Sequence, residues 1–139
     1  MDQYLSTIRD RIIQTVNNIP IYSNSVIVYD IDKTLIDDYG NPIMPILDTY
    51  FYARSMGLIP MIITARYGTA TNTENTKKQL QELNITYKSL YFLPIDKHNP
   101  EIYKREARKH IHDSGYRVEI SVGDMYWDIG EYGGIGFLI

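Results

Sequence analysis

Two carboxylates at the end of a predicted strand are the residues of this sequence best placed for chemistry. Asp30 and Asp32 follow the apolar, β-branched run from Val26 to Tyr29, which is typical of a buried strand in a parallel sheet. If the backbone stays extended for two more residues, both side chains point to the same side. Two carboxylates about 4 Å apart repel by about 4 kcal/mol at an effective dielectric near ~20, so they would share a proton or a divalent cation. The pair indicates a metal or phosphate site, with ordinary turn chemistry as the alternative.

Polar residues also follow two later strands. Ligands of open α/β sheets bind beyond the carboxyl ends of the strands, and Asp30, Thr64 and Asp124 are all expected there. Thr64, with Ala65 after it, can offer a hydroxyl and loop amides to a phosphate oxygen, or can instead bond its own loop. Asp124 can bind Mg²⁺ through a carboxylate oxygen, or can cap a helix that begins near Met125.

Two more charged residues can reach the same edge. Lys104 lies in the first turns of a predicted helix, where its ammonium group would offset carboxylates and phosphate. The alternative is a solvated helix face that Lys104 shares with other basic residues such as Arg108. Asp128 lies four residues after Asp124 and can share its helical face. We expect Asp128 to orient water or a metal ligand, with simple surface exposure as the alternative.

The elements that must position these residues alternate along the chain. An apolar stripe predicts an amphipathic helix within residues 1–19 that packs on the body of the domain rather than on a partner. A capping box of Thr71 and Glu74 is expected to open a later helix. The expected order is a helix in 1–19, a strand over 26–29, a helix over 45–56, a strand over 58–63 that ends at Thr64, a helix over 71–83, a strand over 89–93, a helix from 100 that stops at Gly115, a strand over 117–122 and a strand over 134–139. This alternation predicts a Rossmann-like three-layer α/β/α sandwich around a mainly parallel sheet.

The composition agrees with one globular domain over residues 1–139. Of 139 residues, 44% are hydrophobic and 22% are charged, which is ordinary for such a domain. The formal net charge of -3 argues against a general nucleic-acid binder. Cysteine is absent, which excludes disulfides and thiolate chemistry, and we recognise neither a leader peptide nor a membrane-spanning run. We therefore expect a soluble cytoplasmic protein.

In combination, the motifs resemble those of the haloacid dehalogenase (HAD) superfamily. An Asp-x-Asp-x-Thr motif, a Thr after the second strand, a Lys on a later helix and a Gly-Asp-x-x-x-Asp motif follow one another in the family's order. In detail the chain is similar to the class B-like acid phosphatases, subfamily IIIB, which include plant vegetative storage proteins. The similar stretches are DIDKTL, PIMPILDTYFYARSMGLIPMIITAR, ENTKKQLQEL and YKREARKHIHDSGYRVEISVGDMYWDI.

The resemblance implies a Mg²⁺-dependent phosphatase that hydrolyses phosphate monoesters through an aspartyl-phosphate. Asp30 matches the nucleophile of the family, and Asp32 matches its general acid and base. Thr64 and Lys104 match the groups that hold the phosphoryl oxygens. Asp124, together with Asp30 and the backbone carbonyl of Asp32, matches the Mg²⁺ site.

One departure from the family concerns the loop after the first motif. Only residues 36–43 separate DIDKTL from the next helix, whereas the similar proteins carry a longer loop that helps to shape a lid. We therefore expect a minimal or absent cap and an open site, which suits phosphorylated substrates that include macromolecular esters. Tyr126 and Trp127 can stack on a substrate ring there or pack at the rim.

Two other functions are compatible with parts of the pattern. One is a phosphate-ligand binding or storage protein with weak or no turnover. The other is a receiver-like signalling module, which also combines acids, Thr, Lys and Mg²⁺ on a parallel sheet. A receiver is expected to carry its phosphorylated aspartate after a middle strand, whereas Asp30 follows the first.

Overall fold

A sheet of five parallel strands runs through the protein, as described for residues 2–139 by a computed structural model. Its strands lie in the order β3-β2-β1-β4-β5, and every neighbouring pair is parallel. The strands are β1 (Ser25–Tyr29), β2 (Ile59–Tyr67), β3 (Ser89–Leu93), β4 (Arg117–Gly123) and β5 (Ile135–Leu138). The helices are α1 (Gln3–Asn18), α2 (Met44–Ser55), α3 (Ala70–Glu82) and α4 (Pro100–Asp113), with a short 3-10 helix η1 (Tyr126–Asp128).

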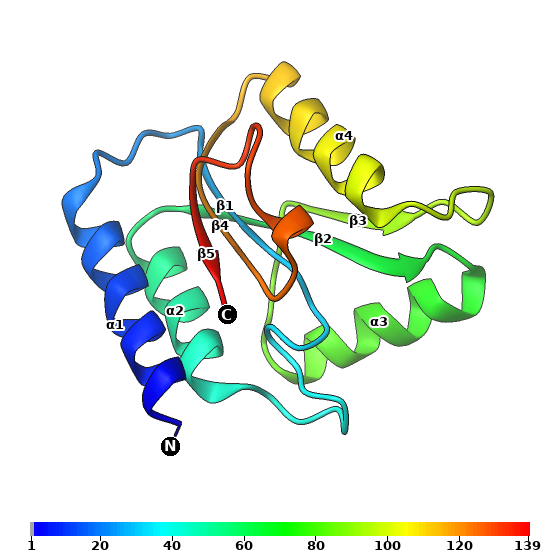
Figure 1. Cartoon of the computed structure of the whole chain (residues 1–139), viewed down its shortest axis with the longest axis horizontal. Coiled ribbons are helices and arrows are strands. Elements are labelled where there is room, and N and C mark those ends of the chain that lie inside the picture. The colour runs from blue at the N-terminus through cyan, green and yellow to red at the C-terminus, as the bar shows by residue number, and fades with distance from the viewer. Residues whose placement is uncertain (1) are drawn as a thin grey trace.

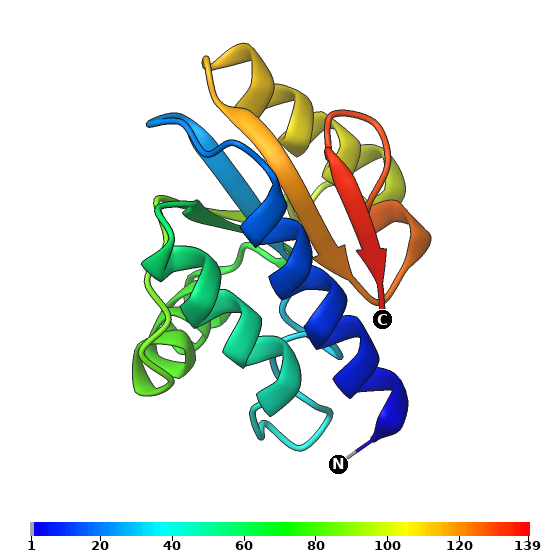
Figure 2. The same cartoon turned by 90° about the vertical axis from the view of Figure 1, so that its left-hand side faces the viewer.

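Helices cover both faces of this sheet. Figure 2 shows α1 and α2 side by side in front of the sheet, with α4 behind it. Ile12 of α1, Ile46 of α2 and Leu80 of α3 belong to one buried cluster, whereas Ala107 and other residues of α4 belong to a second cluster on the opposite face. The predicted three-layer, Rossmann-like α/β fold is therefore confirmed.

The central strand explains how the two faces are filled. All five residues of β1 are buried, as expected for a strand covered on both sides. Ile27 and Tyr29 pack on the side of α1 and α2, whereas Val26 and Val28 pack on the side of α4. This alternation of side chains decides which helix the next residue, Asp30, will face.

The strand order also places a crevice beside β1. From β1 the chain moves outward through β2 and β3 and then returns to β4 on the other side (Figure 1). In sheets of this kind, ligands bind at the carboxyl ends of the strands where the order reverses, here between β1 and β4. The order also differs from the flavodoxin-like order 2-1-3-4-5 that receivers share, so the receiver alternative is wrong.

The predicted start of α3 is wrong by one residue, and its predicted cap is wrong as well. The N-cap is Thr69, whose hydroxyl accepts a hydrogen bond from the backbone N–H of Asn72 at 3.1 Å. The capping box of Thr71 and Glu74 is therefore not formed. Both threonines can cap a helix, and the structure uses the earlier one, so only residues 68 and 69 connect β2 to α3.

Strand β2 is longer than predicted. It continues to Tyr67 instead of ending at Thr64. Its register with β3 shifts between Ile63 and Tyr67, because β2 has more residues there than its partner. Such a bulge removes residues from the regular ladder and re-aims their side chains, so residues 64–66 are still presented at the carboxyl edge.

The segment between β1 and α2 contains no helix and no strand. Residues 30–43 form two isolated bridges, Asp32 to Ile36 and Ile36 to Pro42, and Ile36 itself is buried. The short loop is thus tied to the body of the domain.

Within residues 2–139 no helix combines the length and apolar character needed to cross a bilayer.

Docking of α1 on the sheet can be tested with Ile12, which has no exposed surface. Replacement by Ala should lower the free energy of unfolding by about 2–5 kcal/mol, because it removes buried methylene groups and leaves a cavity. Urea unfolding measures the change. The exposed Arg11→Ala is the control, with an expected change below about 0.5 kcal/mol. An equally small change for Ile12→Ala would contradict a single domain that includes α1.

Candidate active site

Asp30 follows β1 directly and faces α4. Val28 packs with Ala107 of α4 in one apolar cluster, and the alternation of side chains places Asp30 on the same face. Lys104 precedes Ala107 by three residues and therefore shares its side of the helix. The Nζ of Lys104 donates to Oδ1 of Asp30 at 2.8 Å, and the two side chains are only 2% and 8% exposed. Lys104 thus reaches the sheet edge, and the solvated-face interpretation is wrong for it.

Asp128 of η1 makes a second ion pair with Lys104. Its other oxygen accepts the backbone N–H of Met125 at 3.0 Å. Gly123, at the end of β4, makes room for this side chain, because a Cβ there would lie 2.2 Å from the Cβ of Asp128. Asp128 is 5% exposed, so the alternative of a surface acid is wrong.

Asp124 completes a cluster of three acids. One carboxylate oxygen each from Asp30, Asp124 and Asp128 lies within 4.8 Å of the other two. Asp124 does not cap η1, whose N-cap residue is Met125, so that interpretation of Asp124 is wrong. Thr34, the last residue of the first motif, donates its hydroxyl to Oδ2 of Asp30 at 3.2 Å and was not singled out from the sequence.

Burial and charge act against each other in this cluster. Burial raises the pKa of Asp30 to about 6, although Lys104 opposes the shift, and Asp124 raises it further. Burial and then the charge of Asp30 also raise the pKa of Asp128. For Lys104, burial lowers the pKa, but the two neighbouring carboxylates outweigh it and the net direction is upward. The ammonium group of Lys104 therefore stays charged. Its single positive charge does not compensate all of the neighbouring carboxylates.

These residues fit a divalent cation. Three carboxylates and one ammonium group leave an excess of about two negative charges when all are ionised. Hard cations such as Mg²⁺ prefer carboxylate, carbonyl and water oxygens, and the cluster offers carboxylate oxygens at a sheet edge. The cation of the predicted site would thus meet Asp30 and Asp124. That the backbone carbonyl of Asp32 is also a ligand of this cation stays a prediction.

The carboxylate of Asp32 lies outside the acid cluster. The backbone turns around Asp32 and Lys33, where the N–H of Thr34 donates to the carbonyl of Ile31 at 3.2 Å and Lys33 has a φ of 61°, and the side chain of Asp32 pairs with Arg66 instead of the acids. Arg66 donates its Nε and Nη2 to the two oxygens of Asp32 at 2.9 and 2.7 Å. This bidentate ion pair is partly exposed, with 53% of the Asp32 side chain accessible.

The side chain of Arg66, like that of Thr34, is part of the site that sequence reasoning missed. Its third nitrogen, Nη1, donates to Thr76 at 3.0 Å and to Gln79 at 2.9 Å, both on α3. The guanidinium group is therefore fixed by the helix on one side and holds Asp32 on the other. The available signal was an arginine directly after Thr64 and Ala65, at the end of a buried strand.

Thr64 and Ala65 lie on the β2 bulge. Thr64 is fully buried, and its hydroxyl oxygen accepts the backbone N–H of Arg66 at 3.1 Å. The alternative in which Thr64 bonds its own loop is thus realised. A threonine hydroxyl that accepts one hydrogen bond can still donate another. Ala65 is exposed, so its backbone is accessible from the same edge.

A second basic residue of α4 is also buried. Arg108 donates to the backbone carbonyls of Glu131 at 2.8 Å and Trp127 at 2.7 Å, so the solvated-face interpretation is wrong for it. These bonds tie α4 to the segment that carries Asp128. Tyr126 packs edge-on against Trp127 at 5.1 Å between ring centroids, which agrees with the rim-packing alternative.

A parallel sheet with a buried lysine, three clustered carboxylates and a threonine at its carboxyl edge defines a class of enzymes that act on phosphoryl groups with a divalent metal. Within that class, the chain belongs to the HAD superfamily, subfamily IIIB (acid phosphatase), whose sequence profile matches residues 40–137. It is by family a phosphoric monoester hydrolase. Thr64, Lys104, Asp124 and Asp128 lie inside the matched range, whereas Asp30 and Asp32 precede it. A sequence comparison with curated proteins gave no match.

The shifted pKa of Asp30 predicts how cation binding depends on pH. Since the pKa is raised from 3.8 to about 6 on folding, the folded protein binds more protons than the unfolded chain between these values. The metal-free protein therefore loses stability as the pH rises through this window. Mg²⁺ should restore it, so the gain in Tm with Mg²⁺ is expected to be larger near pH ~7 than near pH ~5.

Differential scanning fluorimetry with Mg²⁺ and with EDTA measures these gains. The variant Asp30→Asn lacks the titrating group and is the control, for which the gain should depend less on pH. No gain at either pH value would contradict the cation site, and an equal gain at both values in the unmodified protein would contradict the part of Asp30 in it.

Proposed function

We propose that this protein is a Mg²⁺-dependent phosphatase that hydrolyses phosphate monoesters through an aspartyl-phosphate on Asp30. The observation that carries the proposal is the buried ion pair of Asp30 with Lys104, 2.8 Å long, inside a cluster of acids. Membership of the acid phosphatase family supports the reaction class. No observation favours the alternative of a binding or storage protein without turnover.

Asp30 is oriented for attack on phosphorus. Lys104 holds one of its oxygens and Thr34 the other, so the carboxylate has a fixed direction toward the sheet edge. In the first step an oxygen of Asp30 forms a bond to phosphorus while the bond between phosphorus and the leaving oxygen breaks. This step requires Asp30 to be ionised, which the positive charge of Lys104 favours.

Asp32 is the proposed general acid and base. It gives a proton to the leaving oxygen in the first step. In the second step it takes a proton from water, whose oxygen attacks phosphorus, and the bond to Asp30 breaks to release phosphate. Arg66 holds both oxygens of the Asp32 carboxylate in place, and a carboxylate is the form that accepts a proton. Donation of a proton to the leaving oxygen requires Asp32 to part from Arg66.

The remaining residues compensate the charge of the transferred group. The hydroxyl of Thr64, the backbone of Ala65 and the ammonium group of Lys104 would hold the phosphoryl oxygens. Asp30, Asp124 and the backbone carbonyl of Asp32 would hold Mg²⁺, which when bound offsets the negative charge of phosphate and carboxylates. Asp128 keeps the Lys104 ammonium group in place through their ion pair.

The substrate is a phosphate ester that need not be small. Residues 30–43 contribute only two isolated bridges beside the site, and no helix or strand of a cap lies among them. We infer an open site with a minimal cap, on a single domain over residues 1–139. Such a site does not enclose its ligand, so macromolecular phosphate esters are compatible with it.

The nucleophile can be tested by one substitution. Asp30→Asn should lower the Mg²⁺-dependent release of p-nitrophenol from p-nitrophenyl phosphate by at least about a thousandfold, because an amide does not form the covalent intermediate. EDTA should abolish the activity of the unmodified protein. The control is Asp38→Asn, an exposed acid of the loop after the first motif, which should retain the activity. Activity that survives Asp30→Asn would overturn the assignment.

A further inference from the structure

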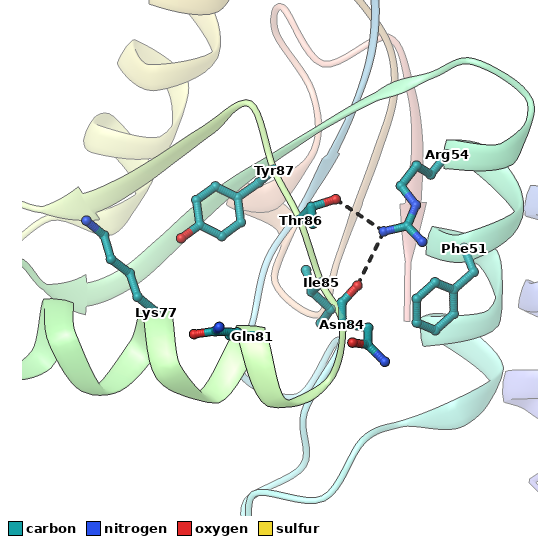
Figure 3. Close-up of a pocket in the computed structure, with 8 residues that line it drawn as sticks. All are labelled: Phe51, Arg54, Lys77, Gln81, Asn84, Ile85, Thr86 and Tyr87. Atoms are coloured by element: carbon teal, nitrogen blue, oxygen red, sulfur yellow. Dashed lines mark hydrogen bonds between the residues drawn. The ribbon is translucent and has the colours of Figure 1, made fainter.

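A groove lies at the sheet edge opposite the catalytic one. It has a volume of about 740 Å³ and is formed by α2, α3 and the segment before β3 (Figure 3). Arg54, near the end of α2, and residues 84–87 precede the starts of β2 and β3, which places them at the amino edge of this parallel sheet. Asp30, Thr64 and Asp124 lie at the carboxyl edge. The groove is therefore separate from the candidate active site.

Arg54 is held in a fixed position at one wall of the groove. Its Nη1 donates to the hydroxyl groups of Tyr50 and Thr86, both at 3.2 Å, and to the backbone carbonyl of Asn84 at 3.3 Å. Its guanidinium carbon lies 5.3 Å from the ring centroids of Tyr50 and Phe51. Within residues 2–139 all of its hydrogen bonds use Nη1, so Nε and Nη2 are unused donors. A guanidinium group fixed in this way presents a preorganised edge to an anion.

Lys77 supplies a second positive charge from another wall. It lies on α3, beside Tyr87, and comes from the opposite side of the groove to Arg54 (Figure 3). The residues that line the groove include no aspartate or glutamate. Apolar and aromatic side chains also line the groove: Ile85 and Tyr87 lie between the two cations, and Phe51 lies beside Arg54 on α2 (Figure 3).

This combination specifies a class of ligand. We propose that the groove binds a small organic dianion with a flat aromatic body, whose two anionic groups pair with Arg54 and Lys77 and whose ring lies on the apolar lining. The volume falls in the range of small-molecule sites, about 300–1,000 Å³. A bare inorganic anion would leave the aromatic lining unused, and an uncharged ring would leave both cations without an anionic partner.

The probe for this site is naphthalene-2,6-disulfonate. It carries two anionic groups on a flat ring system, and its sulfonates are not phosphate esters, so the proposed phosphatase reaction does not consume it. Isothermal titration calorimetry should show saturable binding to one site. Naphthalene, which has no charge, and inorganic sulfate, which has no ring, should each bind at least about tenfold more weakly.

Substitutions at the two cations locate the binding site. Lys77→Ala should weaken binding of the probe about tenfold, because one charge-assisted contact is lost. Lys78→Ala removes the next lysine of α3, which is also exposed but does not line the groove, and should leave binding unchanged. Arg54→Lys should weaken binding although the charge stays, because Lys lacks the two parallel donors.

Several results would overturn the proposal. These are the absence of saturable binding, equal effects of Lys77→Ala and Lys78→Ala, and sulfate that binds as tightly as the disulfonate. Lys77 is exposed, so its replacement does not disturb the core, and thermal unfolding of each variant checks this directly. The titrations contain no phosphate ester, so their outcome is independent of whether the protein proves to be a phosphatase.

Discussion

One lysine ammonium group buried between two carboxylates is the interaction on which the site depends. Lys104 is 2% exposed and pairs with both Asp30 and Asp128. Removal of water from such groups costs several kcal/mol for each ion, and the loss of one partner leaves an uncompensated buried charge, at a cost of about 3–5 kcal/mol. The three groups must therefore stay together. The nearby carboxylate of Asp124 then leaves an excess of negative charge in the cluster, which the proposed divalent cation would offset.

The fold assembles this contact from three separate pieces of the chain. The alternation of β1 turns Asp30 toward α4, and the helical spacing from Ala107 directs Lys104 toward Asp30. At the end of β4, Gly123 leaves the space that Asp128 occupies. The strand order places β1 next to β4, so the first and last acids of the cluster meet although they are far apart in the sequence. On the other side, α3 fixes Arg66, which holds Asp32 away from the cluster.

The features predicted best from the sequence are those that depend on residues close together in the chain, such as the bounds of strands and the starts of helices. Strand β3 has the predicted bounds, and α4 begins at residue 100 as predicted, because apolar runs and the residues that start a helix act locally. The pairing of Asp32 with Arg66 was not predictable in this way. It needs Arg66 to be held by Thr76 and Gln79 of α3, and that support depends on the tertiary structure. Burial of Asp128 likewise depends on packing against a glycine, and no periodicity reveals that.

Chemical trapping of the covalent intermediate tests the central claim, that Asp30 is the nucleophile, most directly. The protein is mixed with Mg²⁺ and p-nitrophenyl phosphate, quenched during turnover and treated with borohydride, which reduces an aspartyl-phosphate to homoserine. Peptide mass spectrometry then locates the reduced residue. We predict reduction at Asp30 alone, dependent on substrate and absent in Asp30→Asn. Reduction at another carboxylate, or steady turnover with no reduced residue, would contradict the claim.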